Sequence, residues 1–314
     1  MTTTFIRAAE VWAPSDDGQL LEYRAGAFGT ARRFEAISQS MCFGRGEGLP
    51  GRAWDEGRPQ LLRQFDAAHF RRAAAAQAAG FTCAAALPFF TGDVLKAVLV
   101  VYCAHGAGAA SALELWHQDP RVTTDMTLVD GAYGPGAQTF ESISHDTTLP
   151  RGVGLPGLAW QRGEGVFMED ITDGTGRFLR AAYASSAGLQ RGLALPAGAR
   201  SAESHVLTFL AGASLPLAQR VERWAPGENR ARLHRVEAFS ELHGGRSQAD
   251  ASLPLDGAGS IAQAFASGMP AINAHPRSEP GAPAAAAAGI GATALIVVPV
   301  QWEDEVSEVV ALYL

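Results

Sequence analysis

One block of roughly a hundred residues occurs three times in this sequence. A tryptophan marks the start of each copy: Trp12 in Glu-Val-Trp-Ala-Pro, Trp116 in Glu-Leu-Trp-His-Gln and Trp224 in Glu-Arg-Trp-Ala-Pro. A period of this length is too long for a solenoid repeat and suits a whole small domain. The repeat therefore predicts three similar domains in a chain of 314 residues.

A glycine-rich turn follows in the first two copies, as Gly48-Leu-Pro-Gly51 and Gly154-Leu-Pro-Gly157, and is reduced to Gly259-Ser-Ile-Ala262 in the third. Such a turn favours the start of a helix, because proline suits the first helical turn. It also offers helix N-terminal amides to an anion, but the structural explanation is the more economical one.

The order of apolar and turn segments predicts the same elements in each copy. Two strands form a hairpin, a short helix follows the glycine turn, and a third strand, an alanine-rich helix and two long strands complete the unit. The first copy is expected to have strands at 5–12 and 19–27, and the alanine-rich helices are expected at 68–79, 177–187 and 282–288, ending at Gly80, Gly188 and Gly289. The fold class is therefore α+β, with an antiparallel sheet of five or six strands in each unit.

The pattern resembles the GAF domain, especially the GAF domains of bacterial sensor kinases and diguanylate cyclases. The residues that carry the resemblance are the Gly-Leu-Pro-Gly-x-Ala-Trp turns ending at Trp54 and Trp160, followed by Phe70-Arg-Arg-Ala73 and Phe178-Leu-Arg-Ala181. The third copy matches mainly by register. The resemblance implies three tandem GAF-like units at 1–106, 107–216 and 217–314, the last of them degenerate.

The absence of two helices of the GAF pattern affects how the units are expected to assemble. The helices that usually flank a GAF domain at both ends are not found around any copy, so one sheet face in each unit is expected to lack its cover. Soluble proteins rarely leave such an apolar face exposed. These faces are therefore expected to pack against other units, a protein partner or a second copy of the chain.

The resemblance also implies a ligand pocket between the sheet and the middle helices. The candidate ligand-binding residues are Trp54, Phe70, Arg72 and Phe89 in the first unit, and Trp160, Phe167, Phe178, Arg180 and Tyr183 in the second. Core packing is the competing explanation for the repeated tryptophans. An exposed helix face is the competing explanation for the arginines Arg58, Arg63, Arg71 and Arg72, which otherwise suggest an acidic ligand.

Composition and spacing argue against several other functions. The net charge is −7 without a basic cluster, so nucleic acid is not an expected partner. Neither a long apolar run nor a signal peptide is present, and the protein is expected to be cytoplasmic, without a membrane partner. The eight histidines form no HxxxH or HExxH pair, and Cys42, Cys83 and Cys103 contain no CxxC, so no metal site is expected.

Catalysis is not expected either. GAF proteins that reduce methionine sulfoxide carry cysteines at positions held here by Pro50, Pro156 and Gln77. The favoured hypothesis is a noncatalytic sensor or regulatory protein that binds a small molecule and acts through protein contacts. The alternatives are an interaction scaffold that no longer binds a ligand, and a cysteine-dependent redox enzyme. The pattern does not name a cofactor.

Overall fold

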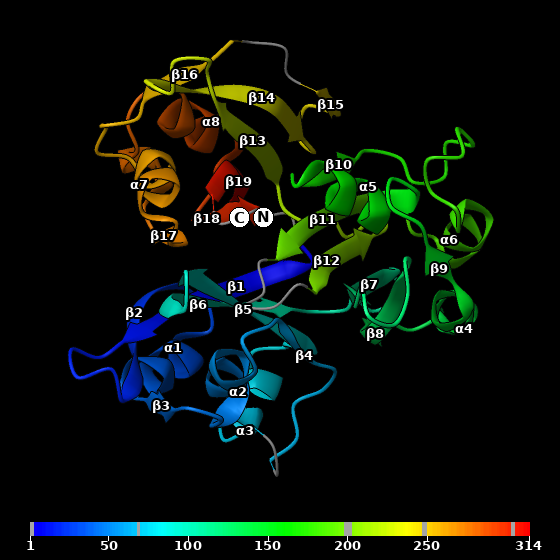
Figure 1. The fold of residues 1–314 in the computed structure, drawn as a ribbon, viewed down its shortest axis with the longest axis horizontal. Coiled ribbons are helices and arrows are strands. Elements are labelled where there is room, and N and C mark those ends of the chain that lie inside the picture. The colour runs from blue at the N-terminus through cyan, green and yellow to red at the C-terminus, as the bar shows by residue number, and fades with distance from the viewer. Residues whose placement is uncertain (1–2, 68–69, 198–202, 247–249, 303–304) are drawn as a thin grey trace.

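The computed structural model describes residues 3–67, 70–197, 203–246, 250–302 and 305–314, and contains three antiparallel sheets arranged around a common centre (Figure 1). Helices lie on the outer side of each sheet, and the C-terminus lies near the centre of the view in Figure 1. Within the described residues, none of the helices is both long enough and apolar enough to cross a bilayer.

The first sheet has six strands in the order β3-β2-β1-β6-β5-β4. Three short helices, α1, α2 and α3, lie in the connections between strands β2 and β5. The elements are β1 (Ile6–Pro14), β2 (Leu20–Ala27), α1 (Arg32–Gln39), β3 (Cys42–Gly44), α2 (Gly48–Glu56), β4 (Gln60–Leu62), α3 (Ala73–Ala78), β5 (Cys83–Thr91) and β6 (Val94–Cys103).

The second sheet repeats this topology, with the order β10-β11-β12-β7-β8-β9. Its first strand, β7, again lies in the middle, paired with its last strand, β12. The elements are β7 (Ser111–Gln118), β8 (Met126–Tyr133), α4 (Gln138–Asp146), β9 (Thr148–Leu149), α5 (Gly154–Arg162), β10 (Val166–Met168), α6 (Ala181–Ala187), β11 (Arg191–Ala197) and β12 (Ser204–Ala211).

The third sheet has seven strands, more than the five or six expected, in the order β15-β14-β13-β19-β18-β17, with β16 also paired to β14. It has two α-helices and a short 3₁₀ helix, η1. The elements are β13 (Arg220–Pro226), β14 (Arg232–Ser240), β15 (Gly245–Arg246), β16 (Ser252–Pro254), α7 (Ser260–Ser267), β17 (Ala271–Asn273), η1 (Pro276–Ser278), α8 (Ala282–Ile290), β18 (Leu295–Trp302) and β19 (Glu305–Tyr313).

The expected hairpins and closing strands are confirmed, but several helix predictions need correction. Helices α1 and α4, which come before the glycine turns, were not predicted. The alanine-rich helix of the first sheet begins at Ala73 rather than at 68, and residues 68 and 69 lie outside the described part. That of the second sheet begins at Ala181 rather than at 177. Helix α8 continues through Gly289, and its left-handed C-terminal residue is Gly291, with φ of 68°.

The second glycine of each Gly-Leu-Pro-Gly turn is required by close packing. A Cβ atom on Gly51 would lie 2.2 Å from the carbonyl oxygen of Gly44, and one on Gly157 would lie 2.5 Å from that of Pro150. Both contacts are with backbone, which has little freedom to move away. The motif therefore lets helices α2 and α5 lie directly against the strand or turn before them.

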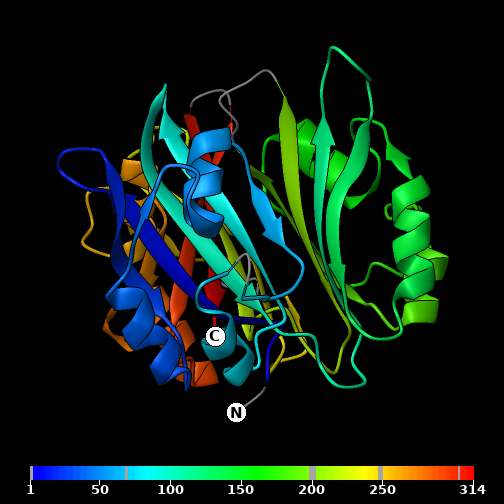
Figure 2. The ribbon, with the colours of Figure 1, turned by 90° about the horizontal axis from the view of Figure 1, so that it is seen from below.

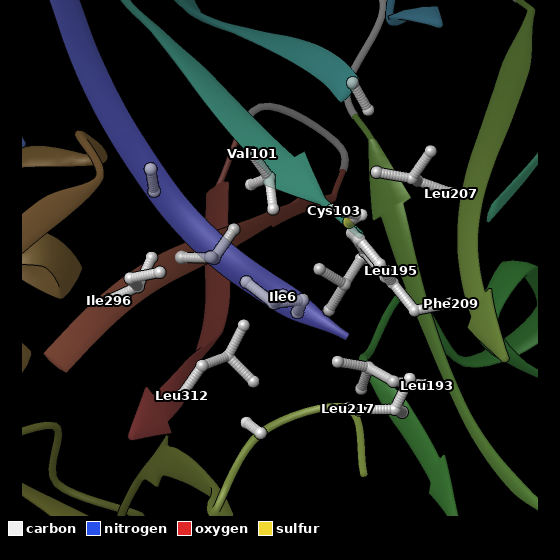
Figure 3. Packing of buried hydrophobic residues seen from close by; sticks show 14 of the residues in the cluster. Ile6, Val101, Cys103, Leu193, Leu195, Leu207, Phe209, Leu217, Ile296 and Leu312 are labelled. Carbon is white, nitrogen blue, oxygen red and sulfur yellow. The ribbon is translucent and has the colours of Figure 1, made fainter. Parts of the chain in front are cut away.

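The inner faces of the three sheets form one hydrophobic core (Figure 3). Side chains alternate along each central strand, so that Val101 of β6 faces this core while Tyr102 faces the helices. Ile6, Leu207 and Leu312 come from different sheets and belong to the same cluster. The expectation that the sheet faces without flanking helices pack against one another is confirmed within this single chain (Figure 2).

Polar contacts link each sheet to the next and close the arrangement into a ring. Arg63 forms an ion pair with Asp130 between the first two sheets. The backbone amide of Gly165 donates to Glu308 at 2.7 Å between the second and third. The side chain of Gln301 donates to the carbonyl of Phe90 at 3.0 Å between the third and first.

Candidate ligand-binding sites

A buried ion pair lies under the helices of the first sheet. The guanidinium of Arg72, which directly precedes α3, donates to both carboxylate oxygens of Glu10, at 2.9 and 2.8 Å. It also donates to the hydroxyl groups of Ser38 and Tyr102. Arg72 is 3% exposed and Glu10 is fully buried, so the pair lies inside the protein and is almost completely shielded from solvent.

The second sheet repeats this arrangement with Arg180 and Glu114, whose atoms lie 2.6 and 2.9 Å apart. Arg180 also donates to Ser144, and Tyr133 and the Trp116 indole donate to Glu114. Burial alone would raise the pKa of Glu114, but Arg180 and the other donors outweigh it and lower the pKa below its ordinary value. Glu114 is therefore held as a carboxylate.

The third sheet also has a buried carboxylate, but the arginines that pair with it come from other elements. Glu222 accepts hydrogen bonds from Arg220 at 2.7 Å and from Arg235 at 3.0 Å, both on strands. The Trp224 indole and the Tyr313 hydroxyl also donate hydrogen bonds to Glu222. In all three sheets the carboxylate is the residue two positions before the repeated tryptophan, so Glu10, Glu114 and Glu222 are a conserved feature of the repeat that sequence reasoning did not identify.

These contacts restrict what Arg72 and Arg180, both proposed as ligand-binding residues, can do. Each guanidinium already faces a full carboxylate and a hydroxyl group, so neither presents a free charge to a ligand. The neighbouring arginines are also paired within the chain, Arg58 with Glu56 at 2.5 Å and Arg71 with Glu47 at 2.8 Å.

The first sheet has a small pocket of about 170 Å³ on its helix-covered side. Phe70 and Arg72 line it, as expected from the sequence, together with Met41, Phe43, Glu47, Gly48 and Arg71. Trp54 packs against the outside of the helix-side core and does not line this pocket. Phe89 belongs to the central core between the sheets, on the opposite face of the sheet from Phe70.

The second sheet borders a larger opening, which we call the 167–178 cleft. It has a volume of about 350 Å³ and adjoins a groove of about 560 Å³ that reaches the third sheet. Phe167, Arg177 and Arg246 line both parts. The other lining residues are Met168, Glu169, Asp170, Asp173, Phe178, Gln190 and Arg191 in the first part, and Arg162, Val166, Arg223, Arg235, Val236, Glu237, Ala238 and Asp250 in the second.

The structure brings together two of the five expected residues of the second unit at this cleft, Phe167 and Phe178. Trp160 is buried in the helix-side core, and Arg151 lies over its ring at 5.6 Å. Arg180 is enclosed with Glu114, and Tyr183 is 42% exposed on α6. The Phe167 ring also contacts Phe239 of the third sheet, with centroids 5.1 Å apart, so the cleft lies at a junction between two sheets.

The cysteines are placed in two different environments. Cys42 is exposed, whereas Cys83 and Cys103 are buried directly opposite one another on β5 and β6. The neighbouring thiol of Cys103 lowers the pKa of Cys83 despite burial, and the imidazole of His105 adds to this effect. Neither buried thiol is open to a substrate.

Residues 2–118 match the GAF domain family. This stretch covers the whole first sheet and continues to the end of β7. No curated protein matches the chain.

Solved structures show low similarity to parts of the chain. The NreA protein of Staphylococcus aureus, mutated in its nitrate binding site, is 12% identical with a TM-score of 0.27, over 32% of this chain and 73% of that one. A structure described as the GAF domain is 13% identical with a TM-score of 0.26, over 32% and 51%. The GAF domain of A. aeolicus nlh2 in an inactive state is 15% identical with a TM-score of 0.26, over 33% and 60%.

Proposed function

We propose that this protein is a noncatalytic sensor built from three GAF-like units, at 1–106, 107–216 and 217–314, that binds a small polar molecule in the 167–178 cleft. The presence of a GAF domain supports a sensing or regulatory role. The cleft carries the proposal, because it combines two aromatic walls with polar and charged groups in a volume that suits a small ligand.

The position of the cleft suggests how binding would be transmitted. Its walls come from strands and loops of the second sheet and, through Arg246 and the adjoining groove, from the third. A ligand that contacts both would favour one packing of the two sheets over others. A protein partner that binds only one of these packings would receive the signal.

The test begins with native mass spectrometry of the purified protein, which detects a retained small molecule directly. Thermal shifts with inorganic phosphate, citrate and AMP then test acidic probes of increasing size. Arg177→Ala removes an exposed cation from the cleft and is expected to reduce any shift. The matched control is Arg33→Ala, an exposed arginine on α1 of the first sheet, which is expected to leave the shift unchanged.

A scaffold that has lost ligand binding is the second candidate, because buried carboxylate networks occupy the helix-side core of every sheet. Failure of native mass spectrometry and of every probe would favour it, provided that a protein partner is still captured. The cysteine-dependent enzyme is disfavoured by the burial of Cys83 and Cys103, and we propose that the protein is not an enzyme.

A further inference from the structure

Two histidines from distant parts of the sequence face each other in the second sheet. His117 on β7 lies directly opposite His205 on β12, and their ring centroids are 4.7 Å apart. Directly opposed residues of an antiparallel pair project from the same face of the sheet. Glu203, immediately before β12, joins them, with one carboxylate oxygen 3.1 Å from Nε2 of His117.

The burial of His205 is not explained by the contacts within the protein. This side chain is 2% exposed, and neither of its ring nitrogens has a hydrogen-bond partner among the described residues. A buried imidazole without a partner is unfavourable, because both nitrogens have lost their hydration. A bound cation would give one of these nitrogens a partner, since a neutral imidazole nitrogen is a common metal ligand.

The donor set suits a transition metal. One ligand atom each from His117, Glu203 and His205 lies within 4.8 Å of the other two. Zinc binds nitrogen and carboxylate oxygen at about 2.0–2.2 Å, which places tetrahedral ligands about 3.3 Å apart. The observed spacing is wider than this, so the site requires the side chains to turn toward the ion when it binds. We propose that His117, Glu203 and His205 bind one divalent transition-metal ion of the zinc type, with a fourth position left for water or another ligand.

Both positively and negatively charged side chains lie around the three residues. Arg121 donates to the other oxygen of Glu203 at 2.7 Å. Burial, the imidazole of His117 and the guanidinium of Arg58 all disfavour positive charge on His205. Each of these arginines forms an ion pair with a nearby carboxylate: Arg121 with Asp119 at 2.7 Å, and Arg58 with Glu56 at 2.5 Å. The ion therefore enters a site in which the two nearby arginines are already neutralised.

Among the described residues, this cluster occurs only in the second sheet. The residue that follows the repeated tryptophan is His117 there, but Ala13 and Ala225 in the other two sheets. Substitution of His117 by alanine therefore gives the second sheet the residue that its two relatives fold with. This makes His117→Ala a conservative test of the site.

The experiment uses the full chain, stripped with EDTA and dialysed. Zn²⁺ is titrated with metal analysis to obtain the stoichiometry, and Co²⁺ is added as a spectroscopic probe of tetrahedral nitrogen and oxygen ligation. The expected result is one ion per chain and a Tm about 5 °C higher at saturating Zn²⁺. His117→Ala and His205→Leu are each expected to lower the affinity at least tenfold and to remove the Tm shift.

Exposed histidines provide the control, and His145→Ala and His234→Ala are expected to bind one ion like the unaltered protein. His205→Leu also removes a buried imidazole without a partner, so it is expected to fold without metal. The proposal is overturned if the unaltered chain binds no Zn²⁺ at micromolar concentration, or if His117→Ala retains both the stoichiometry and the Tm shift.

Discussion

Arg180 and Glu114 form a bidentate ion pair that is closed off from solvent beneath the helices of the second sheet. The pair joins the segment just before α6 to the middle strand β7, and Ser144 of α4 completes it. A guanidinium and a carboxylate in this geometry form two parallel charge-assisted hydrogen bonds. The same relationship between Arg72 and Glu10 occurs in the first sheet, so the pair fixes the helix layer to the sheet in both.

Removal of one partner is expected to be strongly destabilising. Arg180→Met keeps the length of the side chain but leaves Glu114 buried without its cation, which costs about 3–5 kcal/mol of the free energy of unfolding. Urea denaturation measures this directly. The control is Arg71→Met, whose side chain is 75% exposed, and its effect is expected to be within about 0.5 kcal/mol. Equal effects of the two substitutions would contradict the structural role given to Arg180.

The same carboxylate predicts a dependence on pH. The folded-state pKa of Glu114 is lowered relative to the unfolded chain, so its contribution is fully present above its ordinary pKa of 4.5. The contribution is lost as the pH falls through the folded-state pKa. The free energy of unfolding of the unaltered protein is therefore expected to decrease on acidification from pH 5 to pH 3.

Glu114→Gln tests the assignment of this pH dependence, because glutamine resembles a protonated glutamate. The stability of the variant is expected to be lower than that of the unaltered protein at pH 7, and the two curves are expected to converge in acid. Glu228→Gln, at an exposed turn, is the control and is expected to follow the unaltered protein throughout. Parallel curves for Glu114→Gln and the unaltered protein would argue against the assignment.

Much of the topology was predictable, because strands and turns can be recognised from short stretches of sequence. The hairpins and the apolar closing strands follow from alternation and turn residues, and the repeat carries them through all three sheets. Helices α1 and α4 were missed, since neither has the Gly-Leu-Pro-Gly turn or the alanine run that marked the predicted helices. Their buried faces depend on Phe34 and Phe140, which contact the sheet only after folding.

The candidate site was less predictable, because its chemistry depends on pairs distant in the sequence. The resemblance to GAF domains implied Arg72 and Arg180 as ligand-binding residues, but it did not imply that Glu10 and Glu114 already pair with them. The repeated Glu-x-Trp pattern was the available signal, since two residues apart on a strand share one face. His117 and His205 come together only through the β7–β12 pairing, which no short motif encodes.

The end of helix α8 gives a test that separates the sequence expectation from the structure. Gly289 lies inside the helix with open space around the position of a Cβ atom, so Gly289→Ala is expected to stabilise the protein by about 0.5–1 kcal/mol. Gly291 has equally open surroundings but a φ of 68°, and Gly291→Ala is expected to destabilise by about 1 kcal/mol. Thermal denaturation of the two variants measures both signs. If Gly289 ended the helix in the left-handed conformation instead, Gly289→Ala would destabilise the protein.

The shared central core predicts that the three sheets unfold together. Leu207 is fully buried among residues of all three sheets, and Leu207→Ala is expected to cost about 2–5 kcal/mol. One repeated tryptophan lies in each sheet, so fluorotryptophan labelling followed by fluorine NMR reports on each sheet separately. The native resonances of Trp12, Trp116 and Trp224 are expected to disappear at one urea concentration, which is lower for the variant. Persistence of one resonance after the others have gone would mean that its sheet is stable without the common core.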